Sequence, residues 1–224
     1  MWSSANQKKL HCRRRGRGGH QRHTVLCLVL SSDSCEIAID INTVHRYLKL
    51  SDNNRKVTRV DEDQSYPDHP DRFDSWAQLL CSTGLTGRCY WEVEWKGEVN
   101  VSLSYRGIRR KGGSGDCWFG WNDQSWDLMC SHDGYNVCHN STVTHITSSS
   151  SSSGRLAVYV DGPAGSLSFY RVSSDTLTHL HTFSSTFTEP LYPGFGFWVG
   201  DSVSLCSLHE EPPPGGEPSS LLTT

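Results

Sequence analysis

The stretch Val99-Asn-Val-Ser-Leu-Ser-Tyr105 alternates apolar and polar residues without a break. A period of two places the two valines, Leu103 and Tyr105 on one face of a β-strand and the polar residues on the other. Tyr90-Trp-Glu-Val-Glu-Trp95, directly before it, alternates in the same way, with its tryptophans on one face. These two stretches predict strands that each press one face onto a core, and the tryptophans at 91, 95 and 126 are expected to be core residues.

The rest of the chain body repeats this strand pattern. Leu156-Ala-Val-Tyr-Val160 and Ser166-Leu-Ser-Phe-Tyr170 flank the turn-forming cluster Asp161-Gly-Pro-Ala-Gly165, which predicts a β-hairpin. Helical periodicity is weak, and Phe73 to Leu80 fits either one helical turn or another strand. Turn signals recur about every eight to twelve residues, the spacing typical of an antiparallel β-sandwich. The sequence therefore predicts an all-β fold of two antiparallel sheets.

Length and composition agree with one domain. The chain has 224 residues, of which 35% are hydrophobic and 20% charged, with a formal net charge of −3. That is enough apolar material for one sizeable core. A membrane-spanning helix needs about 18 to 20 consecutive apolar residues, and the chain contains no such run. We expect no membrane contact, and composition leaves the oligomeric state open.

The two ends differ from the body. The first 24 residues hold seven Lys or Arg and no acidic residue, so residues 1–32 are interpreted as a disordered basic leader. A nuclear signal or an RNA-contacting arm is the alternative, while the folded body is expected to bind no nucleic acid. The run Thr24-Val-Leu-Cys-Leu-Val-Leu30 is too short for a convincing secretion signal, which favours a cytoplasmic protein. Residues 209–224 are rich in Pro, Gly and Ser and predict a flexible tail.

Nine cysteines are present, and no two of them form a C-x-x-C pair. Without a secretory signal, free buried thiols are the default expectation. Cys12, His20, His23 and Cys27 resemble a zinc set only loosely, so no metal and no cofactor are expected. The sequons Asn100-Val-Ser102 and Asn140-Ser-Thr142 matter only on a secretory route, and Asn100 falls inside a predicted strand.

Motifs for catalysis are missing. The sequence contains no G-x-S-x-G, H-E-x-x-H, G-x-x-x-x-G-K-[ST] or G-x-G-x-x-G pattern. A Ser/His/Asp set assembled in space is the remaining enzymatic hypothesis, and no spacing supports it. We therefore expect a non-enzymatic protein.

Three blocks of sequence go beyond the fold class. They are Leu48-Lys-Leu-Ser-Asp-Asn-Asn-Arg-Lys-Val-Thr-Arg-Val60, then Phe73-Asp74 through Cys89-Tyr-Trp-Glu-Val-Glu-Trp95, then Leu156 to Tyr170 with Glu189-Pro-Leu-Tyr-Pro-Gly-Phe195. In this order they resemble a PRY-SPRY domain, with a PRY segment over 33–72 and SPRY over 73–208. Trp118-Phe-Gly-Trp-Asn-Asp-Gln-Ser-Trp126 is similar to the fish copies of this domain, although Ile41 stands where the PRY segment usually has Pro.

The resemblance implies a concanavalin-like jelly roll that binds a protein or peptide through loops at one end. Fish copies of the domain close NOD-like receptors and tripartite-motif proteins, so the resemblance implies part of an intracellular innate-immune sensor. A similar domain ends the stonefish-toxin subunits, and a toxin-like pore-forming subunit is the alternative. What lies upstream in the full transcript would distinguish the two.

Candidate contact residues come from the loops and from the resemblance. The acidic loop Asp61–Arg72 contains Tyr66, and the basic Gly-rich loop Arg106–Gly115 contains Arg109. Either loop is equally explained as a solvated turn. By position in the family, the binding face also receives Met129, Ser131, His132, Tyr135 and Tyr192. Met129 fits the core as well, and so does Tyr192. If these residues form one recognition face, all of them lie at one end of the sandwich.

Overall fold

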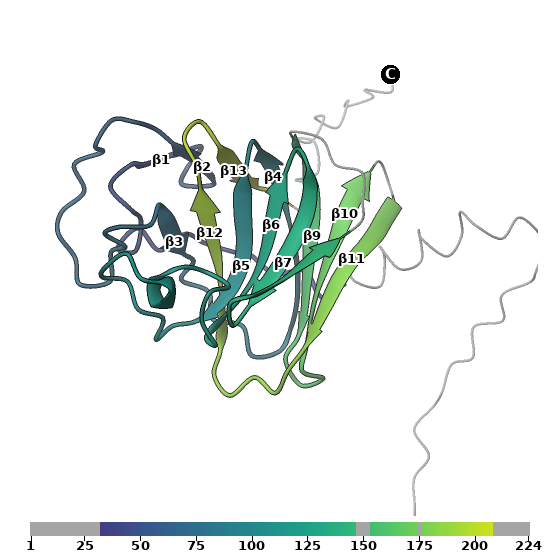
Figure 1. Cartoon of the computed structure of the whole chain (residues 1–224). Coiled ribbons are helices and arrows are strands. Elements are labelled where there is room, and N and C mark those ends of the chain that lie inside the picture. The colour runs from purple at the N-terminus through teal and green to yellow at the C-terminus, as the bar shows by residue number, and fades with distance from the viewer. Residues whose placement is uncertain (1–31, 147–152, 174–175, 208–224) are drawn as a thin grey trace, which may run out of the picture.

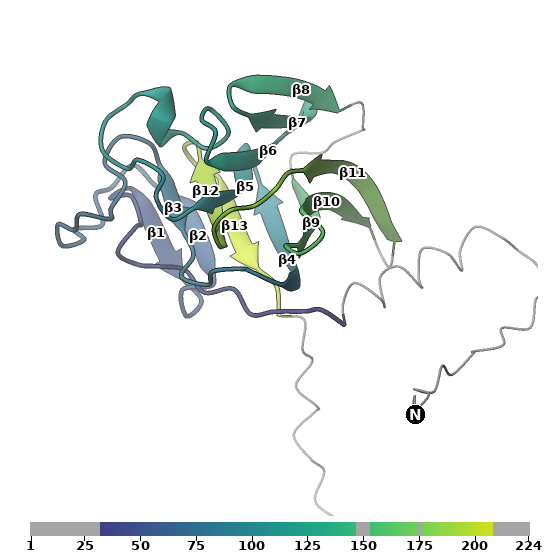
Figure 2. The same ribbon diagram turned by 90° about the horizontal axis from the view of Figure 1, so that it is seen from below.

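The structure, a computed structural model, describes residues 32–146, 153–173 and 176–207. Apart from Ser32, the basic leader lies outside the described residues, and so do the flexible tail and the loose zinc set. Figures 1 and 2 show two sheets packed as layers, and every pairing between strands is antiparallel. The predicted two-sheet antiparallel β-sandwich is confirmed.

The seven-stranded sheet contains the predicted hairpin. Its spatial order is β1 (Leu48–Ser51), β2 (Lys56–Arg59), β13 (Ser202–Leu205), β4 (Arg88–Lys96), β9 (Ser153–Asp161), β10 (Ser166–Ser173) and β11 (Thr176–Ser184). β9 and β10 pair from Asp161 with Ser166 to Arg155 with Val172, across the Gly/Pro cluster. The tight turn at this cluster uses Gly165, whose φ of +66° disfavours a side chain.

The six-stranded sheet carries the candidate binding residues. Its spatial order is β3 (Gln78–Leu80), β12 (Leu191–Phe197), β5 (Val99–Tyr105), β6 (Ser125–Ser131), β7 (Gly134–His139) and β8 (Thr142–Ile146). A short 3₁₀ helix, η1 (Gly115–Cys117), lies in the long loop between β5 and β6. The segment that fitted a helix or a strand forms a strand only over its last three residues, as β3.

The core lies between the two sheets. Trp91, Trp95 and Trp126 are all at most 3% exposed, as the strand pattern predicted. In β5 the predicted alternation holds for the core face, yet Asn100, Ser102 and Ser104 on the other face are buried too. The long β5–β6 loop covers that face, and a strand pattern cannot reveal such a cover.

One expectation about the cysteines is wrong. Cys35 and Cys89 form a disulfide, with Cα atoms 5.6 Å apart and a separation of 54 positions in sequence. The segment before the first strand runs beside β4, where the Cys35 N–H donates to the Tyr90 carbonyl (3.1 Å). This pairing between distant segments brings the two thiols together, and cysteine spacing carries no trace of it. The other cysteines of the described part are free, namely Cys81, Cys117, Cys130, Cys138 and Cys206.

Candidate partner-binding site

Three predicted contact residues lie along β6 and in the turn after it. Met129 and Ser131 are half-buried, and His132 is exposed. His132 Nδ1 lies 3.5 Å from a carboxylate oxygen of Glu98, and its Nε2 lies 3.4 Å from one of Asp133. The imidazole is therefore bracketed by two exposed carboxylates at the end of the sheet.

Tyr135 does not belong with them. Its side chain is 2% exposed on β7 and packs edge-on against Trp95, with ring centroids 6.3 Å apart. The expectation that Tyr135 contacts a partner is wrong, because its position on β7 faces the core between the sheets.

Tyr192 lies at the other end of the sheet. Tyr192 pairs with Ser104, near the end of β5. His132 lies two residues after Cys130, which pairs with Val99 at the beginning of β5. Seven strand residues separate these ends by about 20 Å. The expected single recognition end is therefore wrong. Consecutive connections of an antiparallel sheet alternate between its two ends, so the β5–β6 loop and the β6–β7 turn leave the sheet at opposite ends.

Two of the predicted residues have structural contacts instead of open surface. The Tyr66 hydroxyl donates to the Leu48 carbonyl (2.8 Å), and the Arg72 guanidinium lies 5.0 Å from its ring centroid. Burial raises the pKa of Tyr66. The half-buried Tyr192 packs against a small cluster of core residues and lies 5.5 Å from the Arg106 guanidinium. Arg109 is exposed, 3.8 Å from the carboxylate of Asp116.

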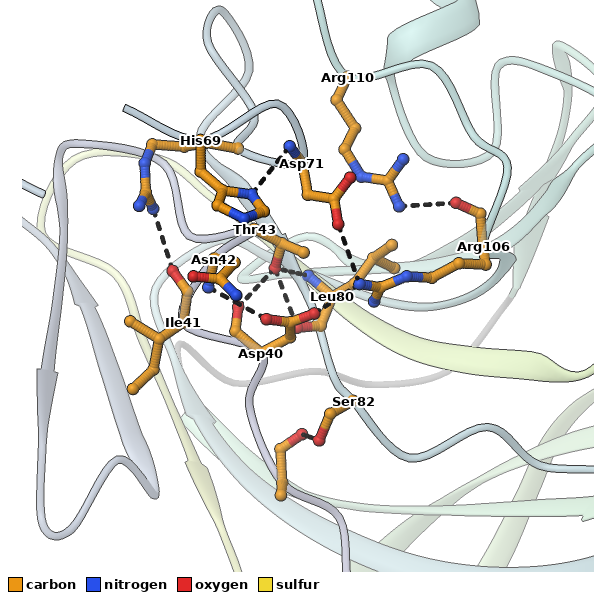
Figure 3. A network of polar contacts seen from close by, with 12 residues as sticks. Asp40, Ile41, Asn42, Thr43, His69, Asp71, Leu80, Ser82, Arg106 and Arg110 are labelled. Carbon is orange, nitrogen blue, oxygen red and sulfur yellow. Dashed lines mark hydrogen bonds and ion pairs between the residues drawn. The ribbon is translucent and has the colours of Figure 1, made fainter. Parts of the chain in front are cut away.

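A polar network ties the PRY segment to the β5–β6 loop (Figure 3). Arg106 donates to Asp40 (2.6 Å) and to Asp71 (3.3 Å), and Arg110 donates to the Arg106 carbonyl (2.6 Å). Both carboxylates belong to the N-terminal third of the chain, and both arginines belong to the loop. The network therefore fixes where the long loop starts on its way across the sheet.

That loop then folds over the outer face of the six-stranded sheet. Gln78 of β3 donates through Nε2 to the Cys117 carbonyl (2.8 Å) and accepts from the Phe119 N–H through Oε1 (3.0 Å). Both bonds are buried. They anchor the loop beside a hollow of about 210 Å³, which no sequence pattern predicted.

Tryptophans form the walls of this hollow, which we call the tryptophan pocket. Its lining residues are Arg59, Trp76, Ala77, Gln78, Asn100, Trp118, Gly196, Phe197, Trp198 and Val199. Trp76 and Trp118 stack with ring centroids 4.5 Å apart, and Trp121 extends the stack from Trp118 at 5.0 Å. Across from them Trp198 is 43% and Val199 61% exposed. Exposed aromatic and aliphatic area beside a preformed hollow is what partner-binding hot spots use.

The floor of the tryptophan pocket is formed by Gly196 of β12 and Asn100 of β5. A Cβ at Gly196 would come within 3.2 Å of both Cβ and Oδ1 of Asn100. The hollow therefore depends on glycine at 196. Asn100 is 1% exposed, and its Oδ1 has no hydrogen-bond partner. A buried acceptor without a partner costs about 1 to 3 kcal/mol, and at functional sites a ligand can supply the missing donor.

Behind the floor lies a fully buried carboxylate. Asp127 of β6 accepts hydrogen bonds from Nδ2 of Asn100 and from the hydroxyl of Ser102. Burial raises the pKa of Asp127 to about 7, and the two donors oppose that shift only in part. The Asn100 amide therefore links a titratable group to the pocket.

A larger hollow of about 470 Å³ lies where the segment 34–37 passes the end of β13. Its apolar residues Ile37, Trp91 and Leu205 are all less than one-tenth exposed. It lacks the exposed aromatic area of the tryptophan pocket.

Within the described ranges, no group of three or more His, Cys, Asp or Glu side chains is placed to hold a metal ion. In the same part of the chain, no helix has the length and apolar character needed to span a bilayer.

The residues of the tryptophan pocket were not predicted from the sequence. No sequence pattern assigned Trp76, Trp118, Trp198 or Asn100 to a site. One signal was available, because Trp118 and Trp121 follow a Gly-rich loop and Trp198-Val199 directly precedes Gly200. Large apolar residues gathered on the surface often mark an interaction site. The buried Asn100 gave no such signal.

The chain is a two-sheet antiparallel β-sandwich with a loop-covered hollow on the outer face of one sheet. Comparison with known families agrees. The SPRY-associated domain, PRY, matches residues 37–85, and the SPRY domain matches residues 88–207. The chain therefore belongs to the PRY-SPRY family.

Relatives occur among fish toxins and tripartite-motif proteins. The chain is 43% identical over 169 residues to stonustoxin subunit beta of Synanceia horrida, covering 75% of this chain and 24% of that subunit. It is 37% identical over 185 residues to tripartite motif-containing protein 16 of Mus musculus, covering 80% of this chain and 33% of the relative. The chain thus spans between about a quarter and a third of these relatives.

Two solved structures are also similar to this chain. The stonustoxin structure superposes with a TM-score of 0.72 at 40% identity, covering 79% of this chain and 28% of the toxin chain. The TRIM65 PSpry domain superposes with a TM-score of 0.73 at 24% identity, covering 88% of this chain and all of that domain. The second likeness shows the fold alone.

Proposed function

We propose that this domain is a non-enzymatic protein-recognition module that receives an apolar side chain of a protein partner in the tryptophan pocket. The exposed Trp198 and Val199, beside the stacked Trp76 and Trp118 over a preformed hollow, carry this proposal. Membership of the SPRY family supports it, since SPRY domains are protein-interaction modules. Loops on a rigid sandwich supply the walls, as in other recognition scaffolds.

The test is a comparison of partner capture by three forms of the chain. Gly196→Ala fills the floor of the tryptophan pocket, because its Cβ would press on Asn100 at 3.2 Å. Val143→Ala is the matched control, since Val143 is 47% exposed on β8 and does not line the pocket. Photo-crosslinking followed by mass spectrometry should recover the partner with the unmodified chain and with Val143→Ala. Equal recovery with Gly196→Ala would reject the tryptophan pocket as the site.

For the parent protein, we propose a tripartite-motif protein or an intracellular innate-immune sensor in the cytoplasm. The similarity to the mouse tripartite-motif protein over 80% of this chain supports the proposal. Reading the full-length transcript upstream of this domain tests it. A RING or a set of leucine-rich repeats would support it, and a pore-forming segment would contradict it.

A toxin-like subunit is the second candidate. The higher identity to stonustoxin subunit beta favours it, and so does the disulfide between Cys35 and Cys89. Disulfides persist in oxidising compartments and are rare in the cytosol. Alkylating the protein in its native tissue before lysis separates the two candidates, because a cytoplasmic protein would carry both thiols alkylated and a secreted one neither.

A further inference from the structure

We propose that the Asn100–Asp127 pair makes the tryptophan pocket selective for an aromatic side chain that carries a neutral N–H or O–H donor, and that protonation of Asp127 relaxes this selectivity. The inference rests on the proposed function, because it names the ligand chemistry of the same pocket. It assigns Asn100 as the residue that contacts the ligand and Asp127 as the residue that orients Asn100.

The orientation of the Asn100 amide follows from the charge of its neighbour. An ionised carboxylate can only accept hydrogen bonds, so Asn100 must turn its NH₂ group to Asp127. The amide oxygen is then left on the side of Gly196, where a Cβ would meet it at 3.2 Å, and it has no partner. The pocket floor thus presents a single buried acceptor, which a ligand donor can satisfy.

The remaining lining residues decide what kind of donor fits. The pocket walls are indole rings and Val199, which favour an aromatic body. The charged lining residue is Arg59, a cation, and it disfavours a cationic ligand. A hollow of about 150 Å³ is known to hold benzene, so one of about 210 Å³ has room for a bicyclic ring. An indole meets all of these requirements.

Protonation of Asp127 removes the reason for this orientation. A carboxylic acid can donate a hydrogen bond, so it can bind the amide oxygen of Asn100 and let the NH₂ group turn to the pocket. The groups facing Asp127 are Asn100 and Ser102 from β5, Cys138 from β7, and Gly120 from the covering loop. The thiols of Cys138 and Cys130 are the titratable neighbours, and burial raises the pKa of both, so they stay neutral. No charge of a Lys, Arg or His residue in the described part contributes to the shift of Asp127.

Because burial raises the pKa of Asp127 to about 7, the change falls near neutral pH. The ionised fraction falls from about nine-tenths at pH 8 to about one-tenth at pH 6. If only the ionised form holds the acceptor toward the pocket, the affinity for a donor ligand falls by up to about tenfold over this range.

Three bicyclic probes test the proposal on the full chain by NMR titration at pH 6 and pH 8. Indole carries the donor, 1-methylindole lacks it, and 1-indanone carries a carbonyl acceptor instead. We expect indole to bind more tightly than 1-methylindole at pH 8 and to lose up to about tenfold in affinity at pH 6. The affinity of 1-methylindole should be independent of pH, and that of 1-indanone should rise at pH 6.

Two variants at the buried carboxylate sharpen the test. Asp127→Asn has the same shape without the charge, so its indole affinity should show no pH dependence. Ser102→Ala removes one donor to the carboxylate but leaves Asn100 in place, so the pH dependence should persist with its midpoint at higher pH. If either variant fails to fold, the three probe profiles of the unmodified chain still decide.

The outcomes separate this inference from the proposed function. Gly196→Ala should abolish binding of all three probes if they occupy the tryptophan pocket. Suppose that Gly196→Ala abolishes indole binding, but the indole affinity does not change between pH 6 and pH 8 or equals that of 1-methylindole. This result overturns the inference and still supports the tryptophan pocket as the binding site. Probe binding that is unaffected by Gly196→Ala, or no binding at all, overturns both.

Discussion

The indole rings of Trp76 and Trp118 stack face to face, with centroids 4.5 Å apart and planes 13° from parallel. Trp76 lies two residues before the short strand β3, and Trp118 lies far along the chain in the loop between β5 and β6. Trp76 also donates through Nε1 to the Ser114 carbonyl (3.3 Å) of the same loop. One wall of the tryptophan pocket is therefore built by two segments that only the fold brings together.

The core tryptophans should dominate stability, and the rim tryptophan should not. Trp91→Ala is expected to lower the free energy of unfolding by about 3 to 5 kcal/mol, because it empties a large volume between the sheets. Tyr135→Ala should also lower stability while leaving partner affinity unchanged in the folded protein. Urea denaturation followed by fluorescence measures both. As a control, Trp198→Ala should lower the free energy of unfolding by less than about 1 kcal/mol. If Trp91→Ala also lowered it by less than about 1 kcal/mol, the burial of Trp91 would be contradicted.

Breaking the disulfide should destabilise the fold measurably. Cys35 and Cys89 close a loop of 54 residues, and loss of such a link costs about 2 to 4 kcal/mol through the entropy of the unfolded chain. Cys35→Ser should therefore lower the melting temperature to the value that the unmodified chain shows after reduction. Cys206→Ser, which removes a free thiol, is the control. A melting temperature insensitive to both reduction and Cys35→Ser would show that the pair is not linked.

Arg72 should hold the PRY segment together. Its guanidinium is buried and donates to the carbonyls of Pro67 (2.8 and 3.1 Å), Ile41 (3.0 Å) and Val44 (2.6 Å). Arg72→Lys keeps the charge but cannot reach all three carbonyls, so we expect a loss of roughly 2 to 3 kcal/mol. Hydrogen exchange should accelerate in the residue range 40–45 before the rest of the sandwich. Arg109→Lys, at an exposed ion pair, should change nothing measurable.

The buried carboxylate should leave a mark on stability as a function of pH. The pKa of Asp127 is raised in the folded state, so between about pH 4 and pH 7 the folded chain holds a proton that the unfolded chain has lost. Stability from this group is present at low pH and is lost as pH rises toward 7, by up to roughly 4 kcal/mol. Relative to Asp127→Asn, the unmodified chain should become less stable from pH 4 to pH 8.

His45 acts in the opposite direction, so the comparison with Asp127→Asn is necessary. Burial lowers the pKa of His45 to about 4, and the unfolded chain takes up its proton first as pH falls. The stability that neutral His45 contributes is therefore lost as pH falls from about 6.5 to about 4. Denaturant midpoints of both proteins at several pH values isolate the Asp127 contribution, because His45 is common to both. A difference that does not change with pH would place the pKa of Asp127 near its ordinary value.

The architecture could be predicted from the sequence because strand burial is a local signal. The alternation in β4 and β5 and the Gly/Pro cluster between β9 and β10 fix which residues face a core and where the chain turns back. The three core tryptophans followed from the same period of two. Similarity of whole sequence blocks added the family, which no periodicity contains.

The candidate site could not be predicted, because its parts depend on where loops run in space. Asn100 and Asp127 read as the solvent face of their strands, and only the β5–β6 loop lying across that face buries them. The disulfide between Cys35 and Cys89 likewise depends on a segment that pairs beside β4. By itself the sequence determined the sandwich, its core and its family, since these follow from the period of two and from local turns. The tertiary structure alone decided the tryptophan pocket and the state of Asp127, because burial by a distant loop sets both the shape of a hollow and the pKa of a carboxyl group.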